Sequence, residues 1–286
     1  MAPARPEPGA PAAPATWSDL RKRVLSAAIL APAALACLWF AALPWTVLIA
    51  LAAAGLGVEW VHLCGRRALE PPGVAVPAAL LLAGATAALG WAGPAAAVLA
   101  VAALLALAWA RPDPRAARLA AGIPYVGLAA IALIWLRRSG DVGRANVLFL
   151  VLIVWASDIG AFLLGRWLGG PRLAPRISPA KTWAGAAGGL LAAVAAGVAV
   201  ARLGSGHLGA PAGLWHTAAV AGGLGLMAQA GDLFESAVKR RFGVKDSGRL
   251  IPGHGGLLDR LDGMLAAAPV AALLALALGP GGPLWR

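Results

Sequence analysis

The chain has 286 residues, of which 60% are hydrophobic and only 13% are charged, and its mean hydropathy is +0.78. About a quarter of the residues in a soluble domain are charged, so this composition excludes a water-soluble globular protein. The net charge of +12 does not indicate a nucleic-acid partner, because its 24 Lys and Arg lie mostly between apolar runs, where anionic lipid and membrane topology account for them.

The first segment, residues 1–16, is rich in Pro and Ala and buries too little apolar surface to fold, so we expect a disordered tail. A basic cluster at 21–23 then precedes the first long apolar run. This order superficially resembles a secretory signal. The long polar lead and the many later apolar runs favour an uncleaved first helix.

Apolar runs of about 20 residues, long enough for a helix to cross the hydrocarbon core, follow one another along the chain. They predict an all-α polytopic membrane protein with nine spans at about 24–41, 43–63, 73–90, 92–110, 119–136, 146–168, 184–202, 214–236 and 263–279. Most of the Lys and Arg fall in the segments on the N-terminal side of the membrane. The positive-inside rule therefore predicts a cytoplasmic N-terminus and places the basic loops 166–183 and 237–262 on the cytoplasmic face.

Small residues recur every four positions in the seventh predicted span, at Gly185, Gly189 and Ala193. This spacing predicts a close contact between helices, because small side chains let two backbones approach. It indicates packing and carries no functional information of its own.

Carboxylates within membrane spans are functional candidates, because they cost several kcal/mol unless they are paired, metal-bound or hydrated. The acidic residues in or next to the predicted spans are Glu59, Asp158, Asp232, Glu235, Asp246, Asp259 and Asp262. Two of them have structural alternatives, since Glu59 can pair with His62 three residues later and Asp158 can pair with Arg166 or Arg176.

The segment 236–262 combines Lys, Arg, Asp, His and Gly in a way that no other part of the chain does. Asp259 and Asp262 are three residues apart and share one side of a helix, while Asp232 precedes the basic loop on the previous helix. Carboxylates beside Lys and Arg suit phosphoryl chemistry with magnesium: the metal takes one or two carboxylates with water and phosphate oxygens, and the basic side chains neutralise the transferring group.

This segment resembles the signature of the phosphatidate cytidylyltransferases, also called CDP-diacylglycerol synthases. The matching positions are Ser236, Val238, Lys239, Arg240, Lys245, Asp246, Gly248, Ile251, Pro252, His254, Gly255, Gly256, Leu257, Asp259, Arg260, Leu261 and Asp262. A second stretch, with Ser157-Asp158, Gly165-Arg166 and ISPAKTWAG at 177–185, is similar to the family's SD…GR…SPKKTWEG region. Ala180 and Ala184 stand where that family usually has Lys and Glu.

The resemblance implies a magnesium-dependent transfer of a cytidylyl group from CTP to phosphatidic acid, giving CDP-diacylglycerol and pyrophosphate. It also implies a homodimer in the cell (inner) membrane, with the catalytic loops on the cytoplasmic side, and leaves a second cation open. The region 17–145 then holds the N-terminal helices, and 146–286 the catalytic helices with the signature at 236–262.

Roles for individual residues follow from the same resemblance. The expected metal ligands are Asp232 and Asp259. The expected catalytic residues are Asp246, Asp262, Lys239 and His254, with His254 positioning phosphate or a neighbouring Asp. The expected substrate-binding residues are Ser236, Arg240, Lys245, Arg260, Lys181 and Ser178.

Two other functions compete with this interpretation. A CDP-alcohol phosphatidyltransferase requires Asp-Gly followed by Ala-Arg and further Asp residues. Asp262-Gly263 begins such a pattern, but Ala266-Ala267 supplies no Arg. A transporter would use Asp158, Asp232 and Glu235 as an ion path and would concentrate its acids at mid-membrane. Most acids here instead cluster at one predicted face.

Overall fold

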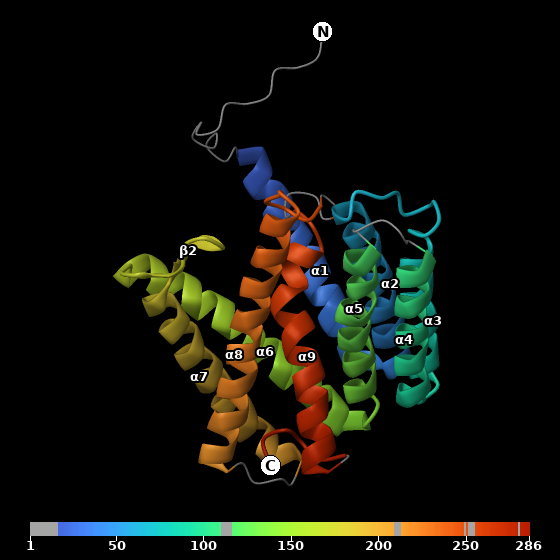
Figure 1. The fold of residues 1–286 in the computed structure, drawn as a ribbon. Helices are drawn as coiled ribbons and strands as arrows, with labels where there is room; N and C mark the ends of the chain where they lie inside the picture. The colour runs from blue at the N-terminus through green and yellow to red at the C-terminus, as the bar shows by residue number, and fades with distance from the viewer. Residues whose placement is uncertain (1–16, 110–115, 209–212, 249, 251–254, 280) are drawn as a thin grey trace.

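The computed structural model describes residues 17–109, 116–208, 213–248, 250, 255–279 and 281–286; the predicted tail 1–16 lies outside this range. The described residues form nine helices and one small antiparallel sheet, which confirms the all-α prediction (Figure 1). The elements are α1 Trp17–Phe40, α2 Ala42–Leu63, α3 Ala75–Ala88, α4 Ala92–Trp109, α5 Ala116–Arg137, α6 Gly140–Leu168, β1 Arg172–Ala174, β2 Ser178–Thr182, α7 Trp183–Leu208, α8 Leu214–Arg241 and α9 Leu258–Leu278.

Six of the described helices, α2, α4, α5, α6, α7 and α9, are long and apolar enough to cross a membrane. The apolar part of α1, Ala28–Phe40, and helix α3 are shorter apolar helices. Helix α8 is long but less apolar, because its glycines and polar side chains such as Gln229 and Asp232 lower its hydropathy. The protein is thus a membrane protein with several candidate spans.

Several boundaries and one element differ from the predicted pattern. Helix α1 begins at Trp17 instead of near 24, α7 ends at Leu208 instead of near 202, and α8 ends at Arg241 instead of near 236. Helix α6 begins at Gly140 instead of near 146, and α9 begins at Leu258 instead of near 263, so both Asp259 and Asp262 lie in the first turns of α9. The connection between α6 and α7 contains the β1–β2 hairpin, which hydropathy did not predict. This hairpin is too short and too polar to leave an apolar pattern.

The helices form two groups that meet at α9 (Figure 1). Helices α2 to α5 pack on one another, α6 packs on α7, and α7 packs on α8. Helix α9 contacts both α5 and α8. The β hairpin and the connection between α8 and α9 lie at the same end of the bundle, opposite the C-terminus.

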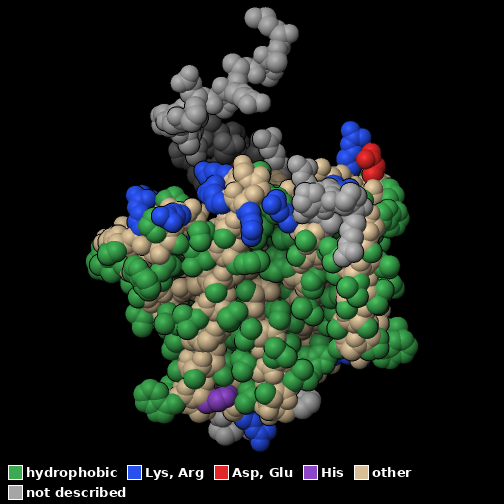
Figure 2. All heavy atoms as spheres, in the orientation of Figure 1, with side chains coloured by type: hydrophobic (Ala, Val, Ile, Leu, Met, Phe, Trp, Pro, Cys, Tyr) green, Lys and Arg blue, Asp and Glu red, His purple; other side chains and the backbone are tan. Residues whose placement is uncertain are grey.

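The charged side chains on the face drawn in Figure 2 gather at the two ends of the bundle. Lys and Arg surround the end that carries the hairpin and the α8–α9 connection, and a smaller group lies at the opposite end. Hydrophobic side chains dominate between them. This distribution suits a bundle whose middle contacts lipid and whose ends contact water or headgroups.

Glycines bring α6 and α7 into close contact, as the small-residue spacing predicts. A Cβ added at Gly188 would lie 2.6 Å from Cβ of Leu164, and one added at Gly185 would lie 2.9 Å from the carbonyl oxygen of Ala161. Gly189 is equally close to α6. Close backbone packing of this kind stabilises helix pairs inside a membrane, where the hydrophobic effect does not drive association.

We predict that Gly188→Ala lowers the stability of the protein by about 1–3 kcal/mol, because the added methyl overpacks the α6–α7 contact. The matched control is Gly223→Ala on α8, where a Cβ would meet none of the described heavy atoms within 4 Å. Thermal unfolding of both variants in one detergent measures the difference. Equal midpoints for the two variants would contradict the tight contact.

Candidate active site

A pocket of about 710 Å³ lies between α6, the β hairpin, α7, α8 and the start of α9. We call it the polar pocket, because charged and polar side chains from all of these elements but α7 line it. These side chains are Asp158, Arg166, Ser178, Lys181, Thr182, Gln229, Asp232, Lys239, Asp259, Arg260 and Asp262. Four carboxylates and four basic groups therefore face one cavity at the end of the bundle where Lys and Arg gather.

Helices α8 and α9 bring their aspartates together through a close contact at Gly231. A Cβ at this position would lie 2.6 Å from the carbonyl oxygen of Asp262 and 2.7 Å from Cβ of Ala266. The next residue on α8 is Asp232, so the helix approach that Gly231 permits also places Asp232 and Asp262 on the same pocket wall. A larger residue at 231 would separate the two helices beside these carboxylates.

Two lysines form ion pairs with aspartates of the polar pocket. Lys181 from the hairpin forms an ion pair with Asp232 of α8. Lys239 lies between two acids, with its Nζ 2.6 Å from Oδ1 of Asp259 and 2.7 Å from Oε2 of Glu235. The side chain of Glu235 is only 1% exposed and that of Lys239 14%, so this ion-pair group is largely shielded from solvent.

Asp259 also fixes the connection that leads into its own helix. Its Oδ2 accepts hydrogen bonds from the backbone N–H of Gly256 at 3.0 Å and of Ser247 at 3.1 Å. The carboxylate thus satisfies backbone donors on both sides of the α8–α9 connection while it binds Lys239. Three partners therefore hold the Asp259 carboxylate in one direction.

The structure brings seven of the twelve predicted site residues to the polar pocket: Ser178, Lys181, Asp232, Lys239, Asp259, Arg260 and Asp262. Four others are not among its lining residues: Ser236, Arg240, Lys245 and Asp246. His254 lies outside the described residues. Lys245 and Asp246 are exposed in the segment after α8, and the Nε–H of Arg240 donates to the carbonyl oxygen of Ile177, which links α8 to the hairpin.

Gln229 is a pocket residue that the sequence reasoning missed. Its Nε2 donates to Oγ of Ser157 at 3.2 Å and to the carbonyl oxygen of Ala186 at 3.1 Å, so it links α8 to α6 and α7. The available signal was an amide side chain within an apolar helix. Asp158, a candidate on the same grounds, lines the pocket from α6.

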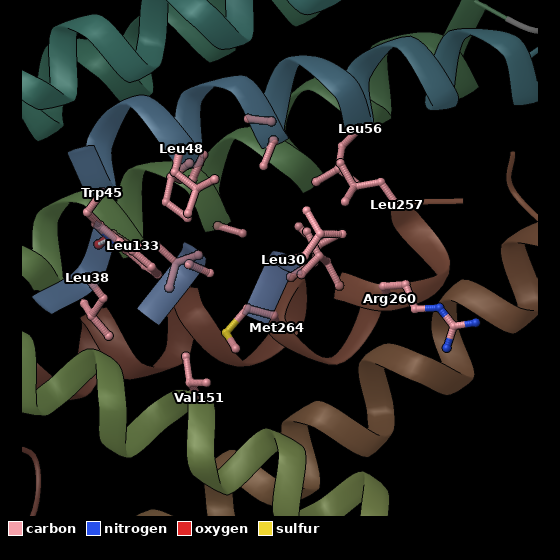
Figure 3. Close-up of a pocket in the computed structure, with 18 of the residues that line it drawn as sticks. Leu30, Leu38, Trp45, Leu48, Leu56, Leu133, Val151, Leu257, Arg260 and Met264 are labelled. Atoms are coloured by element: carbon pink, nitrogen blue, oxygen red, sulfur yellow. Dashed lines mark hydrogen bonds between the residues drawn. The ribbon is translucent and has the colours of Figure 1, made fainter. Parts of the chain in front are cut away.

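A second cavity, of about 410 Å³, lies among α1, α2, α5, α6 and α9. We call it the apolar cleft, because Leu, Ala, Val, Ile, Met and Trp side chains form almost all of its lining (Figure 3). Arg260 is the charged residue at one end of it, with its guanidinium directed away from Leu257 and Met264. Arg260 and Trp155 line both the apolar cleft and the polar pocket, so the two cavities adjoin.

An apolar helix bundle with a carboxylate- and lysine-lined pocket at one end defines a multi-span membrane protein with a charged pocket, a feature typical of a functional site. Sequence comparison then identifies the family to which this membrane protein belongs. The chain belongs to the cytidylyltransferase family, whose sequence profile matches residues 21–278.

The chain is also similar to proteins named phosphatidate cytidylyltransferase. It is 53% identical to the one from Brucella suis biovar 1 (strain 1330) over 154 residues, which cover 54% of this chain and 55% of that protein. It is 38% identical to the one from Staphylococcus epidermidis (strain ATCC 12228 / FDA PCI 1200) over 159 residues, or 56% and 58% of the two chains. The matched regions thus span just over half the length of these relatives.

Proposed function

We propose that this protein transfers a cytidylyl group from CTP to phosphatidic acid, forming CDP-diacylglycerol and pyrophosphate. Family membership and the names of its relatives support a cytidylyltransferase of this kind. The observation that carries the proposal is the junction of the polar pocket with the apolar cleft at Trp155 and Arg260. An enzyme that joins a charged nucleotide to a lipid needs one site for each substrate, and the two sites must meet where the bond forms.

The two substrates divide between the two cavities by their chemistry. The triphosphate of CTP requires the polar pocket, because burying its charge without partners would be prohibitive. An acyl chain loses little when it moves from the bilayer into the apolar cleft, since both surroundings are apolar. Arg260, at the junction, is placed to hold the lipid phosphate by two parallel hydrogen bonds.

The reaction is an in-line displacement that needs no general base. An oxygen of the lipid phosphate, already anionic near neutral pH, attacks the α-phosphorus of CTP. A new P–O bond forms, the bond from the α-phosphorus to the bridging oxygen breaks, and pyrophosphate leaves with that oxygen. Lys181, Lys239 and Arg166 neutralise the phosphate charge, the two lysines exchanging aspartate for phosphate oxygens as partners.

Mg²⁺ is the cofactor that this chemistry implies, and the donor set of the polar pocket fits it. Among the residues that the structure describes, no group of three or more His, Cys, Asp or Glu side chains is arranged to hold a metal ion alone. Mg²⁺ characteristically takes one or two carboxylates and completes its shell with water and substrate phosphates. Asp232 and Asp259 would hold it, and Asp262, on the same pocket wall, would support a second cation. When bound, the metal supplies charge neutralisation at the phosphates.

The remaining features of the proposal concern the membrane. The end that carries the polar pocket faces the cytoplasm of the cell, where CTP is available, and its concentration of Lys and Arg supports this orientation. The region 146–286 supplies the lining of the polar pocket. The homodimer that the family resemblance implies is tested by cross-linking in native membranes.

The deciding experiment supplies the purified protein in detergent micelles with CTP, Mg²⁺ and phosphatidic acid. We expect pyrophosphate release that requires the lipid and the metal, with CDP-diacylglycerol identified by mass spectrometry. Omission of phosphatidic acid and its replacement by diacylglycerol, which lacks the attacking phosphate, are the controls. Lipid-independent ion flux in liposomes without any liponucleotide product would instead favour the transporter.

We predict that Arg260→Gln raises KM for phosphatidic acid by about 10- to 100-fold, because a charged hydrogen-bonding partner of the lipid phosphate is lost. KM for CTP should change much less, since Lys181 and Lys239 remain. Steady-state kinetics with each substrate varied in mixed micelles separates the two constants. An equal rise in both KM values would contradict the placement of the lipid phosphate at Arg260.

A further inference from the structure

Glu59 is a buried carboxylate that comes from the N-terminal group of helices and contacts the α8–α9 connection. It lies on α2 and is only 3% exposed. Its Oε1 accepts a hydrogen bond from the N–H of Leu257 at 2.8 Å. Its Oε2 accepts from the N–H of Leu258 at 2.9 Å and from the hydroxyl of Ser247 at 3.2 Å. These partners of Glu59 lie on the connection and at the first residue of α9, whereas His62, which the sequence suggested, is exposed.

These bonds give α9 an N-terminal cap from another helix. The first N–H groups of a helix have no partner within it, and a negative charge there is favourable. Leu257 and Leu258 are the N-cap and the first residue of α9, and no side-chain cap of its own holds this end. Glu59 supplies the missing acceptor at a sequence distance of about 200 residues, as the bond to Leu258 shows.

Two glycines of the α8–α9 connection lie against the carboxylate of Glu59. A Cβ at Gly248 would lie 2.8 Å from Oε1 of Glu59, and a Cβ at Gly256 would lie 2.9 Å from Oε2 of Glu59 and 1.9 Å from Oγ of Ser247. No side chain fits at either position while Glu59 stays in place. Both glycines belong to the sequence segment that resembles the family signature, and the structure explains their identity by the approach of Glu59.

The α8–α9 connection also donates hydrogen bonds to the carboxylate of Asp259. Ser247 donates its hydroxyl to Glu59 and its backbone N–H to Asp259. Gly256, next to Leu257, donates its N–H to Asp259. The carboxylates of Glu59 and Asp259 thus both accept hydrogen bonds from the α8–α9 connection. Because Glu59 fixes Ser247 and Leu257, it also influences the direction of the Asp259 side chain.

We propose that Glu59 is a positioning residue for the cytidylyl transfer: it acts through Ser247 and the first turn of α9 to fix Asp259 in the polar pocket. Glu59 is not among the described residues that line this pocket, so it reaches substrate only through these neighbours. This inference rests on the proposed function. It extends the active site to α2, in the region 17–145, where the sequence offered Glu59 both as a functional candidate and as a structural partner of His62.

The test compares Glu59→Gln with the unmodified protein in the micelle assay. Gln keeps the shape, but in either orientation its amide NH2 group faces the backbone N–H of Leu257 or Leu258, which can only donate, so the connection must shift. Displacement of a catalytic group by about 1 Å costs up to about 100-fold in rate. We expect kcat to fall about 10- to 100-fold and the half-saturating Mg²⁺ concentration to rise, because Asp259 is a proposed metal ligand, while KM for phosphatidic acid stays unchanged.

Three further measurements make the outcome decisive. Glu70→Gln is the matched control, since Glu70 is an exposed glutamate that follows α2 and forms an ion pair with Arg67, and its kinetics should stay unchanged. Ser247→Ala removes one bond to Glu59 and should lower kcat by up to about tenfold. Combined with Glu59→Gln it should add little, because both changes break the same link.

Each outcome separates the positioning role from the proposed function. If the unmodified protein shows no lipid-dependent turnover, the proposed function itself is wrong. If it turns over and a folded Glu59→Gln protein keeps kcat and the Mg²⁺ dependence within twofold of it, the positioning role alone is wrong. Where Glu59→Gln does not accumulate as folded protein, an unchanged kcat and Mg²⁺ dependence in Ser247→Ala overturns the inference.

Discussion

Asp259→Asn is expected to reduce turnover by at least about 10²- to 10³-fold, while the protein still accumulates in the membrane. The substitution removes a negative charge from the polar pocket and leaves Lys239 with one acidic partner, Glu235. The fold tolerates the change, because Lys239 keeps that partner and the amide oxygen of Asn can still accept a backbone N–H. Pyrophosphate release with saturating CTP and phosphatidic acid measures the loss.

The matched control for this variant is Asp141→Asn. Asp141 is an exposed aspartate in the first turn of α6, where it pairs with Arg144. It lies at the other end of α6 from the hairpin, so we expect normal turnover. Retained activity in Asp259→Asn would remove Asp259 from the metal site, and equal loss in both variants would indicate a general defect of folding or insertion.

Lys239→Met is expected to lower the free energy of unfolding by about 3–5 kcal/mol and to abolish turnover. The substitution leaves the buried Glu235 and the partly buried Asp259 as neighbouring carboxylates without their shared cation. Among the described residues, Oε1 of Glu235 already has no hydrogen-bond partner, so this group has nothing to replace the lysine. Unfolding in mixed detergent, followed by circular dichroism, measures the change against Lys245→Met, whose lysine is exposed and should leave stability unaffected.

A second substitution distinguishes the electrostatic cause from simple loss of packing. Glu235→Gln in the Lys239→Met background removes one of the two uncompensated charges and should restore part of the stability. It should not restore turnover, because the lysine that contacts phosphate is still absent. Failure of the double variant to regain stability would show that Lys239 stabilises the fold by some means other than its ion pairs.

The polytopic helical fold and the acidic cluster were predictable from local information. Apolar runs of membrane-spanning length leave a strong signal, and Asp232, Asp259 and Asp262 are conspicuous because carboxylates are costly there. The helix boundaries were less predictable. Leu258 begins α9 five residues earlier than hydropathy indicated, since polar Asp259 and Asp262 lower the hydropathy of its first turns without breaking the helix.

Contacts between distant segments left no comparable signal. The Lys181 to Asp232 ion pair joins the hairpin to α8, and nothing in the spacing of these residues predicts which acid the lysine selects. Four residues of the signature segment do not line the polar pocket: Ser236, Arg240, Lys245 and Asp246. The first two lie on α8 and the last two follow its C-terminus, so their closeness in sequence to the pocket residues does not bring them into the pocket.

The amino-acid sequence by itself determined that the protein is a helical membrane protein, and it predicted that the chemistry resides in carboxylates and basic groups near 157–185 and 232–262. Both conclusions follow from composition and from residues close in sequence. Only the tertiary structure decided that Glu59 caps α9, that Gln229 links three helices and that Arg260 stands between a polar and an apolar cavity. These facts depend on which helices pack together, and packing joins residues that no local pattern relates.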